Sequence, residues 1–176
     1  ILARAEVHAD ANVRIALVSA LARASGIGGM AGGQMLDLAA EGRFDTKRAL
    51  GETEIVTLQA MKTGALLRFA CRAGALLGQA DDTAHASIER YGAAIGQAFQ
   101  IADDLLDVEG DAATLGKAAG KDAAAGKATL VAVLGIAGAR AKLDQLIAEA
   151  DAALAPFGGK ADTLRAAARF IAERQT

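Results

Sequence analysis

A single proline, Pro156, interrupts the 176 residues of this chain, and no segment alternates apolar and polar residues as half-buried strands do. Proline is the strongest helix breaker among the amino acids, whereas alanine and leucine favour helices. Apolar residues make up 53% of the sequence but aromatic residues only 3%, so small aliphatic side chains have to build the core. Such side chains let helices approach closely. The sequence therefore predicts an all-α protein, a bundle of closely packed helices.

The breaks between the predicted helices fall at glycines and near Pro156. A bend is expected at residues 26–29, and a loop over residues 111–126. Asp81 or Asp82 is expected to cap the following helix. The predicted helices cover residues 1–24, 30–41, 51–77, 82–108, 127–136, 139–155 and 161–174.

The charge of the chain and its cysteine content limit the class of function. With a formal net charge of -2, the chain has no global basic field of the kind that nucleic-acid-binding proteins use. Cys71 is the single cysteine, so no internal disulfide forms, which fits a reducing compartment and predicts a cytoplasmic location. No signal peptide is visible and charged residues interrupt the apolar segments, so no membrane span is expected.

Three aspartates, Asp103, Asp104 and Asp107, stand on the helix predicted over residues 82–108. Asp103 and Asp107 lie one turn apart on one face, where their repulsion costs roughly 0.2–0.5 kcal/mol on an exposed helix. A cation offsets that repulsion, and Mg²⁺ typically takes one or two carboxylates together with substrate phosphates. Taken alone, the pattern fits a solvated acidic face equally well.

Gly-Lys occurs three times in a short segment, ending at Lys117, Lys121 and Lys127. Glycine lets backbone N–H groups approach an anion and lysine adds a point charge, so the segment suits a phosphate. It is not a P-loop, because five residues instead of four separate Gly120 from Gly126 and no hydroxyl residue follows the lysine. Alone, it is better explained as a solvated loop. Next to a magnesium site, it predicts a clamp on a diphosphate.

Two further polar pairs stand among apolar residues. Gln34 and Asp37 are three residues apart, so they share one helix face, which could line a site or simply be exposed. Lys62 and Thr63 interrupt the apolar helix predicted over residues 51–77. They suggest an inward-facing polar pair, although a lysine that extends to the surface is a common alternative.

In chain order, these motifs resemble the C-terminal part of the polyprenyl synthetases, the family of farnesyl and geranylgeranyl diphosphate synthases. The resemblance covers essentially the whole chain, and the Phe-Gln pair before the aspartates makes it specific. Residues 37–42 and 62–66 are most similar to bacterial farnesyl diphosphate synthases. The resemblance implies an all-α bundle around a central cavity, usually in a homodimer. The motifs that carry it are residues 32–37, 62–64, 99–107 and 116–129.

The resemblance implies that the chain is part of a prenyltransferase, which condenses an allylic diphosphate with isopentenyl diphosphate using Mg²⁺. Asp103, Asp104 and Asp107 would then form the second aspartate-rich motif of the family and bind metal. The residues matched around the allylic diphosphate and its metals, which we assign as catalytic, are Lys62, Thr63, Gln100, Lys117 and Lys127. The residues that would bind or line the substrate are Gln34, Asp37, Lys121 and Phe99, the last of which fits a core role equally well.

The chain departs from the family pattern because it lacks the first aspartate-rich motif and the basic residues that bind isopentenyl diphosphate. In the family these lie upstream of the position where this chain starts. Residues 1–176 are therefore expected to be the C-terminal part of a single synthase domain without its N-terminal helices, and to be inactive alone.

Several alternatives to a farnesyl diphosphate synthase stay open. The chain could belong to a geranylgeranyl or other chain-length synthase, or to a non-catalytic regulatory subunit of a prenyl synthase. A terpene cyclase would use similar metal chemistry but would not be expected to carry this lysine segment. A di-iron bundle is disfavoured, because that class needs two Glu-x-x-His motifs and neither His8 nor His85 follows a glutamate by three residues.

Overall fold

The computed structural model of the protein describes residues 1–44, 49–115 and 129–173, with the side chains of residues 110–115 excepted. Every regular element in these ranges is helical, which confirms the all-α prediction. The elements are α1 (Ala11–Ser25), α2 (Met30–Ala40), α3 (Glu52–Gln59), the π-helical turn η1 (Ala60–Gly64), α4 (Ala65–Leu77), α5 (Asp82–Leu115), α7 (Leu130–Ala153), the 3₁₀ helix η2 (Ala155–Ala161) and α8 (Asp162–Glu173).

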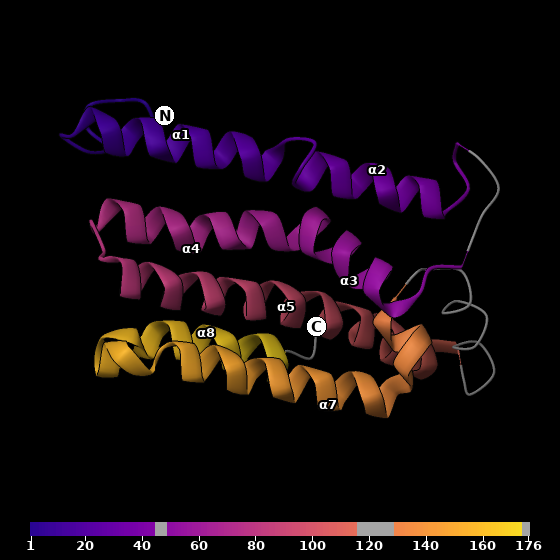
Figure 1. The fold of residues 1–176 in the computed structure, drawn as a ribbon. Coiled ribbons are helices and arrows are strands. Elements are labelled where there is room, and N and C mark those ends of the chain that lie inside the picture. The colour runs from indigo at the N-terminus through magenta and orange to yellow at the C-terminus, as the bar shows by residue number, and fades with distance from the viewer. Residues whose placement is uncertain (45–48, 116–128, 174–176) are drawn as a thin grey trace.

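The long helix α5 occupies the centre of the bundle (Figure 1). It packs against α4 on one side and against α7 and α8 on the other, while α1 lies along α4 and α2 lies along η1. Full burial of a leucine or isoleucine side chain contributes roughly 1.5–3 kcal/mol, so the shared core fixes α5 between its neighbours. This core includes Ile55, Tyr91, Ile101, Leu105, Leu130, Leu143 and Leu154.

Two glycines let η1 touch its neighbours backbone to backbone. A Cβ atom placed on Gly96 of α5 would lie 2.9 Å from the Cα atom of Gly64 in η1, which is too close for a real side chain. A Cβ atom on Gly33 of α2 would lie 2.2 Å from the backbone nitrogen of Lys62. The turn η1 is therefore held closely between α2 and α5.

The first helix begins later than the sequence pattern predicts. Residues 1–10 form turns, and α1 starts at Ala11. The side chain of Asp10 caps α1 by accepting a hydrogen bond from the backbone N–H of Asn12 at 2.8 Å. An N-cap residue takes an extended conformation, so the prediction of a helix over residues 1–24 was wrong before Asp10.

Three other helix boundaries also differ from the prediction. The helix expected over residues 51–77 is divided by η1, and α5 continues through Gly110 to Leu115. The helices expected over residues 127–136 and 139–155 are both contained in α7, and the break expected between them lies slightly earlier, at Gly135, whose φ of 70° and ψ of 168° are not helical. Gly110 inside α5 costs only about 1 kcal/mol relative to alanine, which packing against neighbouring helices can offset.

The segment Ala11–Ala40, which contains α1 and α2, is long and apolar enough to cross a membrane by length and composition alone. The evidence is weak, because a core helix of a globular protein can meet the same criterion. A break between Ser25 and Met30 divides the segment, and its two helices pack along α4 and η1. The absence of a membrane span stays a prediction.

Candidate active site

A chain of hydrogen bonds joins η1 to α5. The hydroxyl of Thr63 donates to Oε1 of Gln100 at 3.0 Å, and Nε2 of Gln100 donates to Oδ1 of Asp104 at 3.1 Å. The other carboxylate oxygen of Asp104, Oδ2, accepts a hydrogen bond from Nε2 of Gln59 at 2.9 Å. Three of the residues predicted from the sequence thus lie in one network, together with Gln59.

Asp104 is only 7% exposed, and its carboxylate is directed at the amides of Gln59 and Gln100. Burial raises the pKa of Asp104 from 3.8 to about 6; the two amide donors lower it, and the charges of Asp103 and Asp107 raise it. Both oxygens of Asp104 are already hydrogen-bonded within the protein, which suits a structural carboxylate. A direct role of Asp104 as a metal ligand stays a prediction.

Asp103 and Asp107 are exposed, one turn apart, on a different part of the α5 surface from the buried Asp104. In the described part of the chain, no three Asp, Glu, His or Cys side chains converge to hold a metal ion unaided. Mg²⁺ does not need such a cage, because it keeps several waters and adds substrate phosphates to one or two carboxylates. The pair of exposed carboxylates fits this mode of binding.

Lys62 forms an ion pair with Asp37, in which Nζ lies 2.5 Å from Oδ2. The side chains of Lys62 and Asp37 are 38% and 24% exposed, so both are partly accessible to solvent. An ion pair this accessible typically contributes only about 0.2–1 kcal/mol to stability. Its main effect is to orient the ammonium group of Lys62 at the junction of α2 and η1.

Lys62 and Thr63 both belong to the π-helical turn η1. A π-helical turn holds one more residue per hydrogen-bonded repeat than an α-helix, and such turns are frequent at functional sites. The turn directs Thr63 to α5 and Lys62 to α2. Adjacent residues thus connect two different helices to the same site.

The remaining predicted residues lie in three places. Gln34 is half-buried on α2, one turn before Asp37. Phe99 is half-buried on α5, directly before Gln100. Lys117, Lys121 and Lys127 fall outside the described residues, so their part in the site stays a prediction.

Gln59 is the residue of the network that sequence reasoning missed. It is 5% exposed and is the last residue of α3. The available signal was that Gln59, one turn before Lys62, is the single polar residue among residues 58–61. Glutamine occurs on so many exposed helix faces that this signal alone did not indicate a buried partner.

The helical fold and the polar network are both consistent with the family that the comparison of sequences identifies. Residues 3–155 match the polyprenyl synthetase family, so the chain belongs to that family. This confirms the resemblance inferred from the motifs.

Two relatives illustrate which members of the family this chain is similar to. The farnesyl diphosphate synthase of Escherichia coli (strain K12) is 46% identical over 165 residues, which cover 92% of this chain and 54% of that protein. Geranylgeranyl pyrophosphate synthase 9 of Arabidopsis thaliana, a chloroplastic protein, is 40% identical over 161 residues, covering 91% of this chain and 44% of that one.

A crystal structure of an FPP/GFPP synthase from Zymomonas mobilis superposes with a TM-score of 0.85 and is 42% identical, covering 97% of this chain and 55% of that one. This chain therefore spans about half the length of the relatives that it matches.

Proposed function

We propose that the intact protein containing this chain is a trans-isoprenyl diphosphate synthase, which condenses an allylic diphosphate with isopentenyl diphosphate in the presence of Mg²⁺. Farnesyl diphosphate is the favoured product. The observation that supports the proposal most strongly is the network that joins Thr63 on η1 to Gln100 and Asp104 on α5. It occurs in a chain of the polyprenyl synthetase family, beside the exposed pair Asp103 and Asp107.

The reaction requires that the allylic C–O bond breaks and that the diphosphate leaves with the electron pair. The isopentenyl double bond then attacks the allylic carbocation, and the new bond is followed by loss of a proton. The main task of the protein is to stabilise negative charge that develops on the leaving diphosphate, which is electrostatic catalysis. No nucleophilic side chain is needed.

The charged groups of the site suit this task. Asp103 and Asp107 would hold Mg²⁺, which would supply Lewis-acid chemistry for the leaving group. Lys62, oriented by Asp37, would place its ammonium group against a diphosphate oxygen. Lys117 and Lys127 would act in the same way from the segment after α5.

The neutral groups hold this arrangement in place. Thr63 donates its hydroxyl hydrogen to Gln100, so its oxygen keeps its lone pairs as hydrogen-bond acceptors for the site. Gln100 is in turn held by Asp104, and Asp104 by Gln59. Gln59 and Asp104 therefore act as positioning residues for the groups that contact substrate.

The first prediction tests Asp103. In the intact protein, Asp103→Ala should lower turnover about 10²–10³-fold, because it removes a group that stabilises charge in the transition state. The measurement is the rate of prenyl diphosphate formation as a function of Mg²⁺ concentration. Asp82→Ala, at the exposed first turn of the same helix, is the matched control and should behave as the wild type. Near-wild-type turnover of Asp103→Ala at limiting Mg²⁺ would contradict the assigned role.

The same assay separates the alternatives. Chromatography of the product distinguishes a C15 from a C20 prenyl diphosphate, a choice that the differently named relatives leave open. If the intact protein is inactive alone but raises the activity of a separate synthase, the chain belongs to a regulatory subunit instead. The proposal also includes a homodimer in the cytoplasm, and light scattering of the intact protein tests the dimer.

A further inference from the structure

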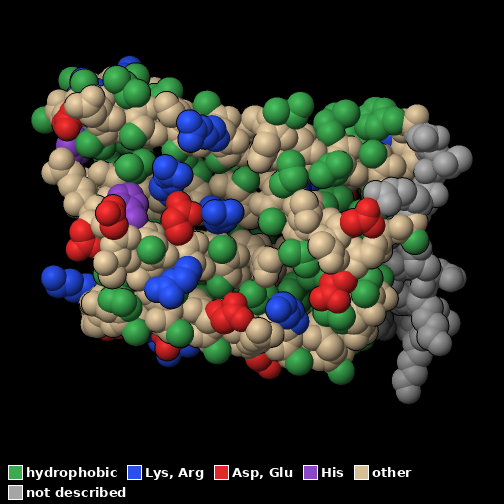
Figure 2. Space-filling view, in the orientation of Figure 1, with side chains coloured by type: hydrophobic (Ala, Val, Ile, Leu, Met, Phe, Trp, Pro, Cys, Tyr) green, Lys and Arg blue, Asp and Glu red, His purple; other side chains and the backbone are tan. Residues whose placement is uncertain are grey.

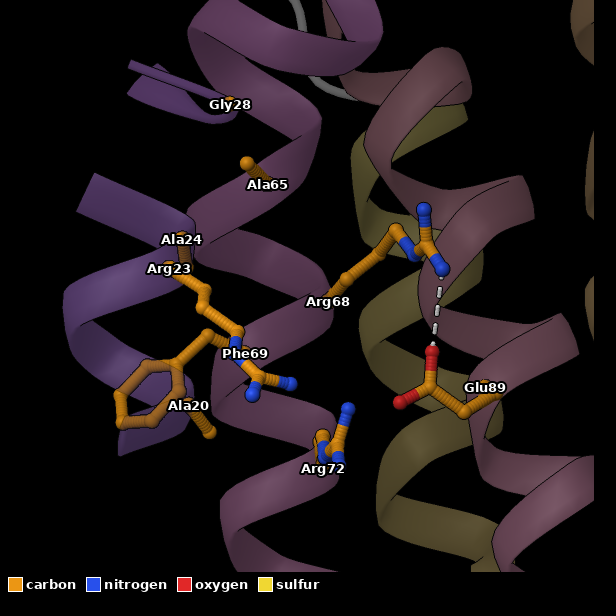
Figure 3. Close-up of a pocket in the computed structure, with 9 residues that line it drawn as sticks. All are labelled: Ala20, Arg23, Ala24, Gly28, Ala65, Arg68, Phe69, Arg72 and Glu89. Atoms are coloured by element: carbon orange, nitrogen blue, oxygen red, sulfur yellow. Dashed lines mark hydrogen bonds and ion pairs between the residues drawn. The ribbon is translucent and has the colours of Figure 1, made fainter. Parts of the chain in front are cut away.

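A pocket of about 210 Å³ opens between α1, α4 and α5 (Figure 3). None of its lining residues belongs to the network described above. Its walls carry Arg23 from α1, Arg68 and Arg72 from α4, and Glu89 from α5. Phe69 adds an aromatic wall, and a Cβ atom placed on Gly28 would meet no atom within 4 Å.

The pocket carries more positive than negative charge. Arg68 pairs with Glu89, with Nη2 and Oε2 3.2 Å apart. Arg23 and Arg72 form no hydrogen bond or ion pair with any described residue. The three arginines and one glutamate therefore leave two positive charges uncompensated, although the whole chain has a net charge of -2. On the face shown in Figure 2, basic side chains gather over α1 and α4.

This arrangement is unfavourable without an anion. Arg68 and Arg72 are four residues apart on α4, a spacing at which like charges repel. Arg23 approaches the same space from the facing helix (Figure 3). Arg165, where α7, η2 and α8 meet, shows the contrasting case, because it pairs with the carboxylates of Asp151 and Asp162.

We propose that this pocket binds a phosphate or diphosphate group. The planar fork of a guanidinium group matches two phosphate oxygens at once, and a dianion would balance the two uncompensated charges. Drug-sized ligands usually occupy pockets of about 300–1,000 Å³, so this smaller pocket suits an anionic group more than a large molecule. The group could come from free inorganic diphosphate or from the head of an organic phosphate whose apolar part lies against Phe69.

Calorimetric titration of the intact protein with inorganic diphosphate in EDTA tests the proposal, because chelation removes metal-dependent binding at the candidate active site. Wild type should bind saturably. Arg23→Gln and Arg72→Gln should each weaken binding about tenfold or more, as expected for loss of a charge-assisted hydrogen bond. Arg4→Gln, an exposed arginine outside the pocket, is the matched control and should leave binding unchanged.

Further variants separate this pocket from the candidate active site. Lys62→Gln should leave the arginine-dependent binding of diphosphate intact. Arg72→Lys keeps the positive charge but loses the planar guanidinium group, so it should bind diphosphate more weakly than the wild type and more tightly than Arg72→Gln. Tighter binding of butyl phosphate than of inorganic phosphate would identify an organic source, and equal binding an inorganic one. Both results support the site.

Two outcomes would overturn the proposal. One is binding of diphosphate by Arg23→Gln and Arg72→Gln with the affinity of the wild type. The other is absence of saturable diphosphate binding in the wild type. If the oligomeric mass of these variants then also differs from that of the wild type, the arginines pair with carboxylates of another protein surface instead. Because all three arginines are exposed, the substitutions should not prevent folding.

Discussion

Asp104 lies in the interior with each carboxylate oxygen accepting one amide hydrogen bond, from Gln59 and from Gln100. A buried polar atom that loses its partner costs about 1–3 kcal/mol, and more if it is charged. The stability of this part of the protein therefore depends on Gln59 even though Gln59 is not expected to contact substrate. The sequence pattern predicted a metal-binding role for Asp104 because it stands beside Asp103 and Asp107. The pattern did not indicate that the side chain of Asp104 points into the protein interior.

The second prediction concerns Gln59. Gln59→Leu should lower the free energy of unfolding by about 1–3 kcal/mol, because it leaves Oδ2 of Asp104 without a donor. It should also raise the Mg²⁺ concentration needed for half-maximal activity, since α5 would hold its aspartates less firmly. Denaturant unfolding and a Mg²⁺ titration of turnover measure the two effects. Gln145→Leu, at an exposed position of α7, should change stability by less than about 0.5 kcal/mol. Equal stability and an equal Mg²⁺ requirement in Gln59→Leu and wild type would contradict the role.

At the scale of the helix, backbone contact between η1 and α5 sets the distance over which Thr63 reaches Gln100. Gly64 and Gly96 make that contact, and any side chain at Gly96 would push the two elements apart. Overpacking of this kind typically costs about 1–3 kcal/mol. The geometry of the site therefore depends on two residues that carry no side chain.

The third prediction tests this contact with a pair of matched substitutions. Gly96→Ala should destabilise the protein by about 1–3 kcal/mol and lower activity, because the new Cβ atom would meet Gly64 at 2.9 Å. Gly74→Ala lies in α4, where a Cβ atom meets nothing within 4 Å, so it should stabilise the helix by up to about 1 kcal/mol. Thermal unfolding and turnover measure both variants. The idea fails if Gly96→Ala is as stable and active as Gly74→Ala.

The fourth prediction concerns the contact of α5 with α8. The hydroxyl of Tyr91 donates to the carbonyl of Leu164 at 2.9 Å, and burial raises the pKa of Tyr91 from 10.0 to about 12. Between these values the unfolded chain has released the proton and the native protein has kept it, so stability must fall as the pH rises from about 10 to 12. In Tyr91→Phe this part of the pH dependence should be absent. Denaturant unfolding of both proteins at pH 9 to 12 measures it, and equal slopes would rule the explanation out.

Individual helices show how far the sequence could predict the fold. The cap of α5 was predictable, because Asp81 accepts a hydrogen bond from the backbone N–H of Ala84 at 2.8 Å, as its residue type and position suggest. The continuation of α5 through Gly110 was not, because the loss of helix propensity at one glycine is small compared with packing. The division of residues 51–77 by η1 also depends on contacts with α2 and α5, which no local pattern contains.

At the scale of the whole molecule, α1 and α2 expose several large apolar side chains that are not part of the core. The large apolar side chains there that are at least 43% exposed are Ile15, Val18, Met35 and Leu36, and Ile27 between the helices is 89% exposed. Figure 2 shows hydrophobic side chains gathered over α2. Contiguous exposed apolar surface usually marks an interface, and relatives of this chain are about twice as long.

The fifth prediction follows from that surface. Residues 1–176 expressed alone should show no condensation activity, because they span only about half the length of the relatives that they match, and they should bind a dye that reports exposed apolar surface. The intact protein should be active and bind less dye. Turnover and dye fluorescence of the two proteins at equal concentration provide the test. Activity of the 176-residue chain equal to that of the intact protein would contradict this expectation.

The π-helical turn η1 also sets the angular phase between the two parts of the segment that it joins. Successive residues of an α-helix are rotated by about 100°, so removal of one residue from η1 would rotate α3 by that angle relative to α4. Gln59 lies before the turn and Arg68 after it, so the deletion could not keep both on their present partners. A one-residue deletion in this turn should therefore be far more damaging than a substitution at any one of its positions, and the length of this segment should be as strictly required as its composition.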